Sequence, residues 1–251
     1  MAASSNVEKT RMNERMHCSA AATLTLLSGL LLSGCTTPQP SVTPSESSNM
    51  AVSAAFHFQA EPLNCEEPGH ETLSSVVRVA STDGADASGV VIARNRVLTA
   101  AHVLDDHIQA LVYVDATYQQ ATVIARDSAN DLVILDTPTG FLTPIRISTE
   151  NLFSAEPVWT VGFPLALEQT ANFGRYQQHV NGAIHSTAST NAGASGGGLL
   201  RCTGGNFELA GMIRGYGAYW DAGELRRIED LSISVPADTI SAFVVNAGVG
   251  L

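Results

Sequence analysis

Lysine is almost absent from this chain of 251 residues. Lys9 is the only one, the formal net charge is -11, and charged residues make up only 15% of the sequence. The arginines form no basic cluster. Proteins that bind nucleic acid need a concentration of positive charge to meet the phosphate backbone. Nucleic-acid binding therefore has no electrostatic basis here, and we expect no nucleic-acid partner.

Cysteine is also scarce, and its spacing excludes the common zinc motifs. The four cysteines are Cys18, Cys35, Cys65 and Cys202. No two of them form a C-x-x-C pair, and no histidine groups with them at the spacing of metal ligands. We therefore expect no metal site, and nothing in the sequence indicates a cofactor.

The apolar run near the N-terminus is too short for a confident membrane span. It covers residues 20–32, follows Arg11 and Arg15, and has the length of a signal-peptide core. The letters LSGC, which end at Cys35, resemble the bacterial lipobox. This resemblance predicts a lipoprotein signal peptide over residues 1–34, with the Cys35 sulfur as the lipidation site. An ordinary secretory signal or an uncleaved anchor is the alternative.

The next segment, residues 35–64, is expected to be a lipid-attached flexible linker, because it is rich in Pro, Ser and Thr and has little charge. Thr36 is not an aspartate, which in Gram-negative lipoproteins implies sorting to the outer membrane. We therefore expect a protein of the bacterial envelope, held to the membrane by its lipid. In such an oxidising compartment Cys65 and Cys202 could form a disulfide; two independent buried thiols are the alternative.

The first half of the folded body, residues 65–150, has the pattern of a small antiparallel barrel. Its six short β-branched runs follow one another about every ten residues, and turn-forming residues separate most of them. No helical period interrupts them. The six runs are Val76–Val79, Val90–Ala93, Val97–Thr99, Leu111–Val114, Thr122–Ala125 and Leu132–Leu135.

The second half, residues 151–251, also contains short β-branched runs separated by turns, but it ends in a segment with a helical pattern. From Pro236 onward apolar residues recur at helical spacing, with Asp238 as the expected cap. The predicted fold is therefore all-β: two six-stranded antiparallel β-barrels and a short C-terminal helix. The strands predicted for the second barrel are Val158–Val161, Tyr176–Ile184, Gly198–Leu200, Glu208–Ile213 and Leu231–Val235.

Three motifs along the chain carry the residues of a nucleophilic serine site. They are TAAH, which ends at His102, Asp131 before an apolar strand, and GASGG around Ser195. A serine hydroxyl is a weak nucleophile unless a base removes its proton and a third group orients that base. The catalytic candidates are Ser195 as the nucleophile, His102 as the base and Asp131 as the group that orients the base. Asp127 and Asp136 are alternatives for the carboxylate.

The order of these residues excludes two other hydrolase classes. The α/β-hydrolases order their triad as Ser, acid, His. No histidine follows Ser195 in this chain, the last one being His185. A subtilisin-like order needs an aspartate well upstream of the histidine; Asp83 and Asp86 stand there, but they lie in a predicted turn, and alternating helices and strands are missing.

Residues 70–245 resemble the trypsin-like serine peptidases of bacterial type, similar to glutamyl-endopeptidase and HtrA-like protease domains. The letters SGVVI and LAGMI, on either side of the central motifs, add to the resemblance. It implies a chymotrypsin-like fold and a serine endopeptidase that cleaves proteins or peptides through an acyl-enzyme. It also implies an oxyanion hole formed by the amides of Gly193 and Ser195.

The resemblance gives two candidate substrate-binding residues. Ser189 corresponds to the base of the primary specificity pocket, and its neutral side chain argues against selection of Lys or Arg. Arg214 occupies or adjoins a position close to the triad carboxylate, so it could perturb Asp131 or point into the substrate cleft. If it points into the cleft, Arg214 together with His185 could favour an acidic substrate side chain.

Two departures from the family pattern leave a second function open. Ala194 replaces the acidic or amide residue usual before the nucleophile, so activation by an ion pair with a newly cleaved N-terminus is not available. Gly198 replaces the usual proline and should loosen the turn. The alternative function is therefore a catalytically inactive trypsin-like homologue that acts as a binding or assembly protein.

Overall fold

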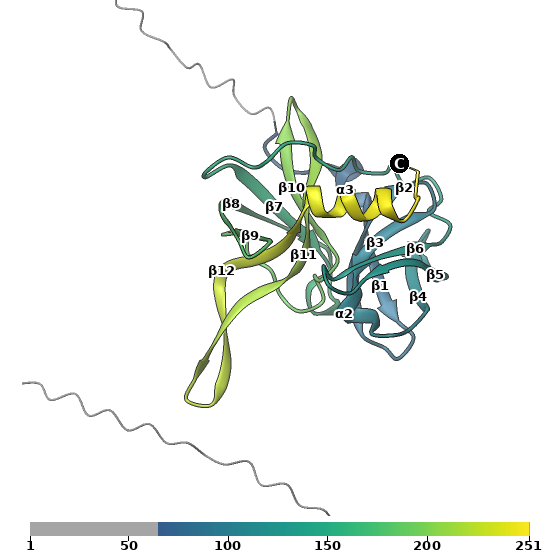
Figure 1. Cartoon of the computed structure of the whole chain (residues 1–251), viewed down its shortest axis with the longest axis horizontal. Helices are drawn as coiled ribbons and strands as arrows, with labels where there is room; N and C mark the ends of the chain where they lie inside the picture. Colours follow the sequence, from purple (N-terminus) through teal and green to yellow (C-terminus); the bar gives the residue numbers. More distant parts are fainter. Residues whose placement is uncertain (1–64, 251) are drawn as a thin grey trace, which may run out of the picture. The chain divides into compact units, whose positions relative to one another are not determined.

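A computed structural model describes residues 65–250, whose strands form two closed antiparallel barrels of six strands each (Figure 1). The first barrel has the strand order β1-β2-β3-β6-β5-β4. Its strands are β1 (Val76–Ser81), β2 (Asp86–Ala93), β3 (Arg96–Ala100), β4 (Gln109–Val114), β5 (Thr117–Asp127) and β6 (Leu132–Asp136). Each predicted run in this half lies within one of these strands, so the prediction of the first barrel is confirmed.

Alternation along the strands divides the apolar residues between two cores. In β3, Val97 packs inside the first barrel, whereas its neighbour Leu98 packs in a second cluster. That second cluster also contains Trp159, Leu200 and Met212 from the other half of the chain. Because β3 and β6 are buried on both faces, the residues that follow β3 and precede β6 are held in fixed positions.

The second barrel has the order β10-β11-β12-β9-β8-β7, and one predicted strand in it was wrong. The predicted strand Tyr176–Ile184 is a hairpin that turns at Asn181 and Gly182, both with positive φ. Asn-Gly is the strongest short hairpin signal, and this hairpin supplies the sixth strand. The strands are β7 (Pro157–Gly162), β8 (Thr170–Val180), β9 (Ala183–Ser186), β10 (Gly198–Thr203), β11 (Asn206–Asp221) and β12 (Glu224–Pro236).

The hairpin of β11 and β12 is much longer than the predicted strands Glu208–Ile213 and Leu231–Val235. The two strands remain paired as far as Asp221 and Glu224, and Figure 1 shows the hairpin extending away from the second barrel. Its outer part carries exposed apolar side chains, of which Trp220 is 72% exposed. The sequence pattern missed this extension because its residues do not alternate between a buried and an exposed face.

The C-terminal helix is confirmed, but its predicted cap is wrong. The helix is α3 (Ala237–Asn246), and its N-cap residue is Pro236. Asp238 lies inside the first turn, where its carboxylate accepts the N–H of Thr239 at 2.6 Å. Across residues 65–250, no helix is long and apolar enough to cross a membrane. The short helices are α1 (His70–Ser74), α2 (Ala101–Leu104) and the 3-10 turn η1 (Pro164–Ala166).

A disulfide joins Cys65 to Cys202, the first residue described and a residue of β10. Their Cα atoms are 6.0 Å apart, which is within the range of ordinary disulfides. This bond resolves the two alternatives for these cysteines in favour of pairing. The predictions for residues 1–64, including the signal peptide, the linker and lipidation of Cys35, lie outside the described residues.

Removal of this disulfide should strongly reduce the stability of the fold. The two cysteines are 137 residues apart in sequence, so the bond restricts a large loop in the unfolded chain. In the chain-entropy model such a loop corresponds to about 4–5 kcal/mol of unfolding free energy. Urea unfolding of the oxidised and reduced protein would measure this difference.

The control for that measurement is a variant in which Cys65→Ala and Cys202→Ala are combined. Its unfolding free energy should equal that of the reduced protein and should not change further with reductant. An oxidised protein that is less than about 1 kcal/mol more stable than this variant would contradict the prediction.

Candidate active site

His102 and Asp131 meet because they flank two paired strands. β3 ends at Ala100, and His102 is the second residue of α2, which follows directly. Asp131 directly precedes β6, and Ala100 pairs with Leu132. The His102 Nδ1 atom lies 2.8 Å from Asp131 Oδ2, and the backbone N–H of His102 donates to Asp131 Oδ1 at 2.8 Å. Both carboxylate oxygens therefore orient the same histidine, whose ring is half exposed and open to a ligand.

The environment of Asp131 keeps its carboxylate ionised. Burial raises the pKa of Asp131, but the hydrogen bonds from the side chain and backbone of His102 lower it more. The charges of His102 and Arg214 act in the same direction, so the pKa lies below the ordinary value. An ionised carboxylate at this position holds the Nδ1–H tautomer of the imidazole and leaves Nε2 free to accept a proton.

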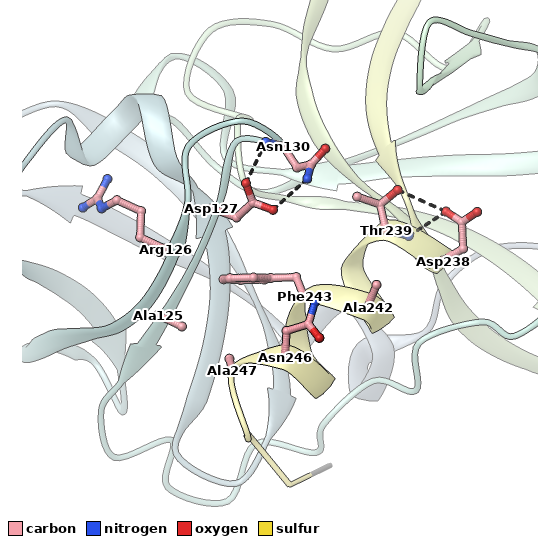
Figure 2. Close-up of a pocket in the computed structure, with 10 residues that line it drawn as sticks. All are labelled: Ala125, Arg126, Asp127, Asn130, Asp238, Thr239, Ala242, Phe243, Asn246 and Ala247. Carbon is pink, nitrogen blue, oxygen red and sulfur yellow. Dashed lines mark hydrogen bonds between the residues drawn. The ribbon is translucent and has the colours of Figure 1, made fainter.

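The two alternative carboxylates are used elsewhere. Figure 2 shows Asp127 at the end of β5, where its oxygens accept the side-chain amide and backbone N–H of Asn130 at 2.7 and 3.1 Å. Asp136 forms an ion pair with Arg96. The cavity in Figure 2 has a volume of about 770 Å³ and lies between β5 and α3. Among the described residues, neither of these carboxylates bonds to His102, whose ring and backbone bond to Asp131.

Ser195 lies in the loop between β9 and β10, and it reaches the His102–Asp131 pair through Arg214. Its hydroxyl donates to the backbone carbonyl of Arg214 at 3.3 Å. The Nε atom of Arg214 in turn lies 3.6 Å from Asp131 Oδ2. Among residues 65–250, no hydrogen bond joins Ser195 to His102. Such bonds are often long or misaligned before substrate binds, and rotation of the serine hydroxyl changes its partner.

The carbonyl groups around Ser195 are held by hydrogen bonds from other segments of the chain. The carbonyl of Ala192 accepts the N–H of Leu165 at 2.7 Å. The buried Ser88 binds two more: its hydroxyl donates to Gly193 O at 2.9 Å, and its N–H donates to Ser195 O at 2.9 Å. Within the described part of the chain, the N–H groups of Gly193 and Ser195 donate to no acceptor.

This loop depends on its glycines. Gly193 and Gly196 have φ values of +87° and +86°, a conformation that side chains disfavour. A Cβ atom on Gly196 would also collide with the carbonyl of Ser88 and the hydroxyl of Thr99. Ala194 is 3% exposed and packs near Gly162, so a larger acidic side chain has no space in this conformation.

The two predicted substrate-binding residues lie in different places. The hydroxyl of Ser189 donates to Glu229 O at 2.8 Å and borders a cavity of about 640 Å³, together with Arg227, a residue that the sequence analysis missed. Arg214 borders a separate cavity of about 420 Å³ with His102 and Asp131. No three His, Cys, Asp or Glu side chains among residues 65–250 form a group that could hold a metal ion.

Ser88 is a further residue of this site that was not predicted from the sequence. It is the first residue of the SGVVI motif. Its two contacts with the loop are to backbone carbonyls, and its Oγ also accepts the backbone N–H of Phe163, just after β7, at 2.9 Å. The signal that could have found it is a serine, rather than an apolar residue, at a fully buried strand position.

Comparison with known proteins agrees with this fold. Residues 87–208 match the family model of the trypsin-like peptidase domain. The match contains all three of His102, Asp131 and Ser195, and it extends from β2 of the first barrel into β11 of the second. No curated protein sequence matches the chain.

Solved structures with the same fold include bacterial serine proteases. The Rv3671c protease from M. tuberculosis in its active form is 22% identical, with a TM-score of 0.61 over 72% of this chain and 83% of that one. Its inactive form is 23% identical, with a TM-score of 0.59 over 71% and 91%. A serine endoprotease from Yersinia pestis is 22% identical, with a TM-score of 0.59 over 72% and 68%. At these identities the likeness shows the chymotrypsin-like fold.

Proposed function

We propose that this protein is a serine endopeptidase with Ser195 as nucleophile, His102 as general base and Asp131 as the group that orients the base. One observation carries the proposal. The Asp131 carboxylate binds both the ring and the backbone of His102, and Arg214 links it to a serine whose loop has two unpaired N–H groups. This combination provides a base and an electrostatic site for a negative oxygen.

The reaction begins with a rotation of Ser195 Oγ from Arg214 O towards His102 Nε2. His102 then takes the hydroxyl proton as Oγ bonds to the carbonyl carbon of the substrate, whose oxygen becomes negative. The N–H groups of Gly193 and Ser195 stabilise that oxygen. The imidazolium gives its proton to the departing amine, which leaves an acyl-enzyme. Water, activated by the same histidine, hydrolyses the ester and regenerates Ser195.

We further propose that the substrates are proteins or peptides and that the enzyme is held at the bacterial envelope by lipid on Cys35. The lipobox-like letters and the Pro-, Ser- and Thr-rich residues that follow support the second part. Mass spectrometry of the membrane fraction would show a diacylglycerol on Cys35, and Cys35→Ala would release the protein from that fraction.

A binding or assembly protein without catalytic activity is the second candidate. It is favoured by the hydrogen bond of Ser195 to Arg214 O in place of one to His102. If that bond persists when substrate is present, the hydroxyl keeps its proton and cannot attack. The two candidates therefore differ in whether Ser195 reacts as a nucleophile.

Labelling with a fluorophosphonate probe distinguishes these functions. We expect the folded protein to form one covalent adduct on the peptide that contains Ser195, since activated serine hydroxyls attack the phosphorus and ordinary ones do not. Intact-mass and peptide-mass measurements would locate the adduct. The urea-unfolded protein is the control and should remain unlabelled. A folded protein without any adduct would favour the binding protein.

A further inference from the structure

We propose that Arg78 is a positioning residue for the oxyanion hole, acting from the first barrel through a strained turn. This assignment rests on the proposed peptidase function. Arg78 is in β1, far in sequence from the loop of Ser195, and it touches neither His102 nor Ser195. Its effect is exerted on the direction of one peptide group, the one that joins Ala192 to Gly193.

The Arg78 guanidinium holds the turn that follows β7. It donates to the carbonyls of Ala166, at 2.8 Å, and Leu167, and its Cζ atom lies 4.7 Å from the centre of the Phe163 ring. These contacts join the first barrel to a turn of the second, and they use both terminal nitrogens of the guanidinium. A planar side chain with several donors suits this role better than lysine, which has a single ammonium group.

The held turn has an unfavourable backbone conformation. Leu165 and Ala166 both have a φ of +56°, in the left-handed region, which costs about 1–2 kcal/mol for a residue with a side chain. The exposed side chain of Leu165 gains little by packing there. The carbonyls that Arg78 binds belong to this turn and the residue after it, so the guanidinium stabilises a conformation that the turn itself disfavours.

The turn determines the direction of the peptide between Ala192 and Gly193. Leu165 N–H donates to the carbonyl of Ala192 at 2.7 Å. Because a trans peptide is planar, its C=O and N–H point in opposite directions, and no cis peptide occurs among the described residues. Binding of this carbonyl by the turn therefore points the Gly193 N–H away from the turn, where it has no acceptor and can receive a substrate oxygen.

Arg78 and Ser88 form the two parts of one support. They are directly opposite each other in the β1–β2 pair, so their side chains share a face of the sheet. Ser88 binds the carbonyls of Gly193 and Ser195, and Arg78 acts on the preceding carbonyl through the turn. Without Arg78, the turn can relax, the Ala192 carbonyl loses its donor, and the peptide can rotate so that this carbonyl occupies the oxyanion hole.

The test compares Arg78→Gln with wild type in hydrolysis of a peptide substrate by the full chain. We expect kcat to fall by about tenfold to a hundredfold with KM changed less than about threefold, since the hole acts on the transition state. The inhibition constant of a peptide aldehyde, whose adduct carries a negative oxygen, should rise by a similar factor. Arg78→Lys should recover part of the loss through its remaining charge and donors.

Arg175→Gln is the matched control. Arg175 also donates to a backbone carbonyl, that of Ala155 at 2.9 Å, and also lies over an aromatic ring, 5.8 Å from the centre of Phe173. Its substitution should leave kcat and aldehyde binding within twofold of wild type. Thermal unfolding of both variants separates a loss of structure from a change in the hole.

Two outcomes would overturn the assignment of Arg78. One is an Arg78→Gln enzyme with wild-type kcat and wild-type aldehyde affinity. The other is a loss of kcat that equals the loss in Arg175→Gln, which would indicate a general structural effect. A wild-type protein that hydrolyses nothing and takes up no fluorophosphonate would instead overturn the proposed peptidase function and this assignment together.

Discussion

Replacing Ser195 by alanine should lower kcat/KM for peptide hydrolysis by at least about 10⁴-fold. The substitution removes the only group at the site that can form the acyl-enzyme. Ser195 is partly exposed, so a substrate can reach its hydroxyl. The methyl group fits the space of the serine, so the loop that holds the oxyanion donors should keep its shape. Progress curves with a fluorogenic peptide would measure the loss.

The fold should be unaffected by this substitution, because the only hydrogen bond that it removes is the 3.3 Å contact with Arg214 O. Thermal unfolding of Ser195→Ala should therefore match wild type within a few degrees. Ser154→Ala, in an exposed turn, is the matched control and should keep wild-type activity. A Ser195→Ala protein with a tenth or more of wild-type activity would refute Ser195 as the nucleophile.

The sequence predicts the His102–Asp131 pair well because it depends on local order. His102 follows the end of one apolar strand by two residues, Asp131 directly precedes another, and pairing of those two strands brings the residues together. The division into two barrels is predictable for the same reason, since short β-branched runs and turns have local signatures. The second barrel was less complete because its Asn181-Gly182 turn was read as part of one strand.

The contacts that hold the loop of Ser195 could not be predicted in this way. Arg78 and Ser88 bind backbone carbonyls that are at least 88 residues away in sequence, and any residue type can present a carbonyl. The positive φ values of Leu165 and Ala166 are equally unpredictable, because neither residue favours that conformation. The sequence also does not determine where the Arg214 side chain points, because its direction depends on a tertiary contact with Asp131.

Replacing Asp131 by asparagine should lower kcat by about 10⁴-fold near neutral pH, although the side chain keeps its shape. In wild type, Asp131 Oδ1 accepts the backbone N–H of His102 and Oδ2 accepts the ring Nδ1–H. If the asparagine oxygen keeps the backbone contact, its NH₂ group faces Nδ1. Nδ1 must then accept rather than donate, so the proton moves to Nε2 and the ring can no longer take the proton of Ser195.

Asp136→Asn is the matched control for this substitution. Asp136 is half exposed and pairs with Arg96 at the surface of the same barrel, so its loss should change kcat less than twofold. Fluorophosphonate labelling should slow with kcat in Asp131→Asn and remain fast in Asp136→Asn. An Asp131→Asn enzyme within tenfold of wild type would show that another group orients the histidine.

The stability of Asp131→Asn should depend on pH in a direction fixed by the pKa of the carboxylate it replaces. Because that pKa lies below the ordinary value of 3.8 in the folded protein, ionised Asp131 stabilises the fold fully above 3.8. This contribution disappears as the pH falls through the lower folded value. Asparagine has no such contribution, and it leaves Arg214 without its anionic partner. Urea unfolding should therefore give wild type a larger unfolding free energy than the variant at pH 7, and this difference should shrink towards pH 2. A difference that is constant with pH would mean that the Asp131 charge does not stabilise the site.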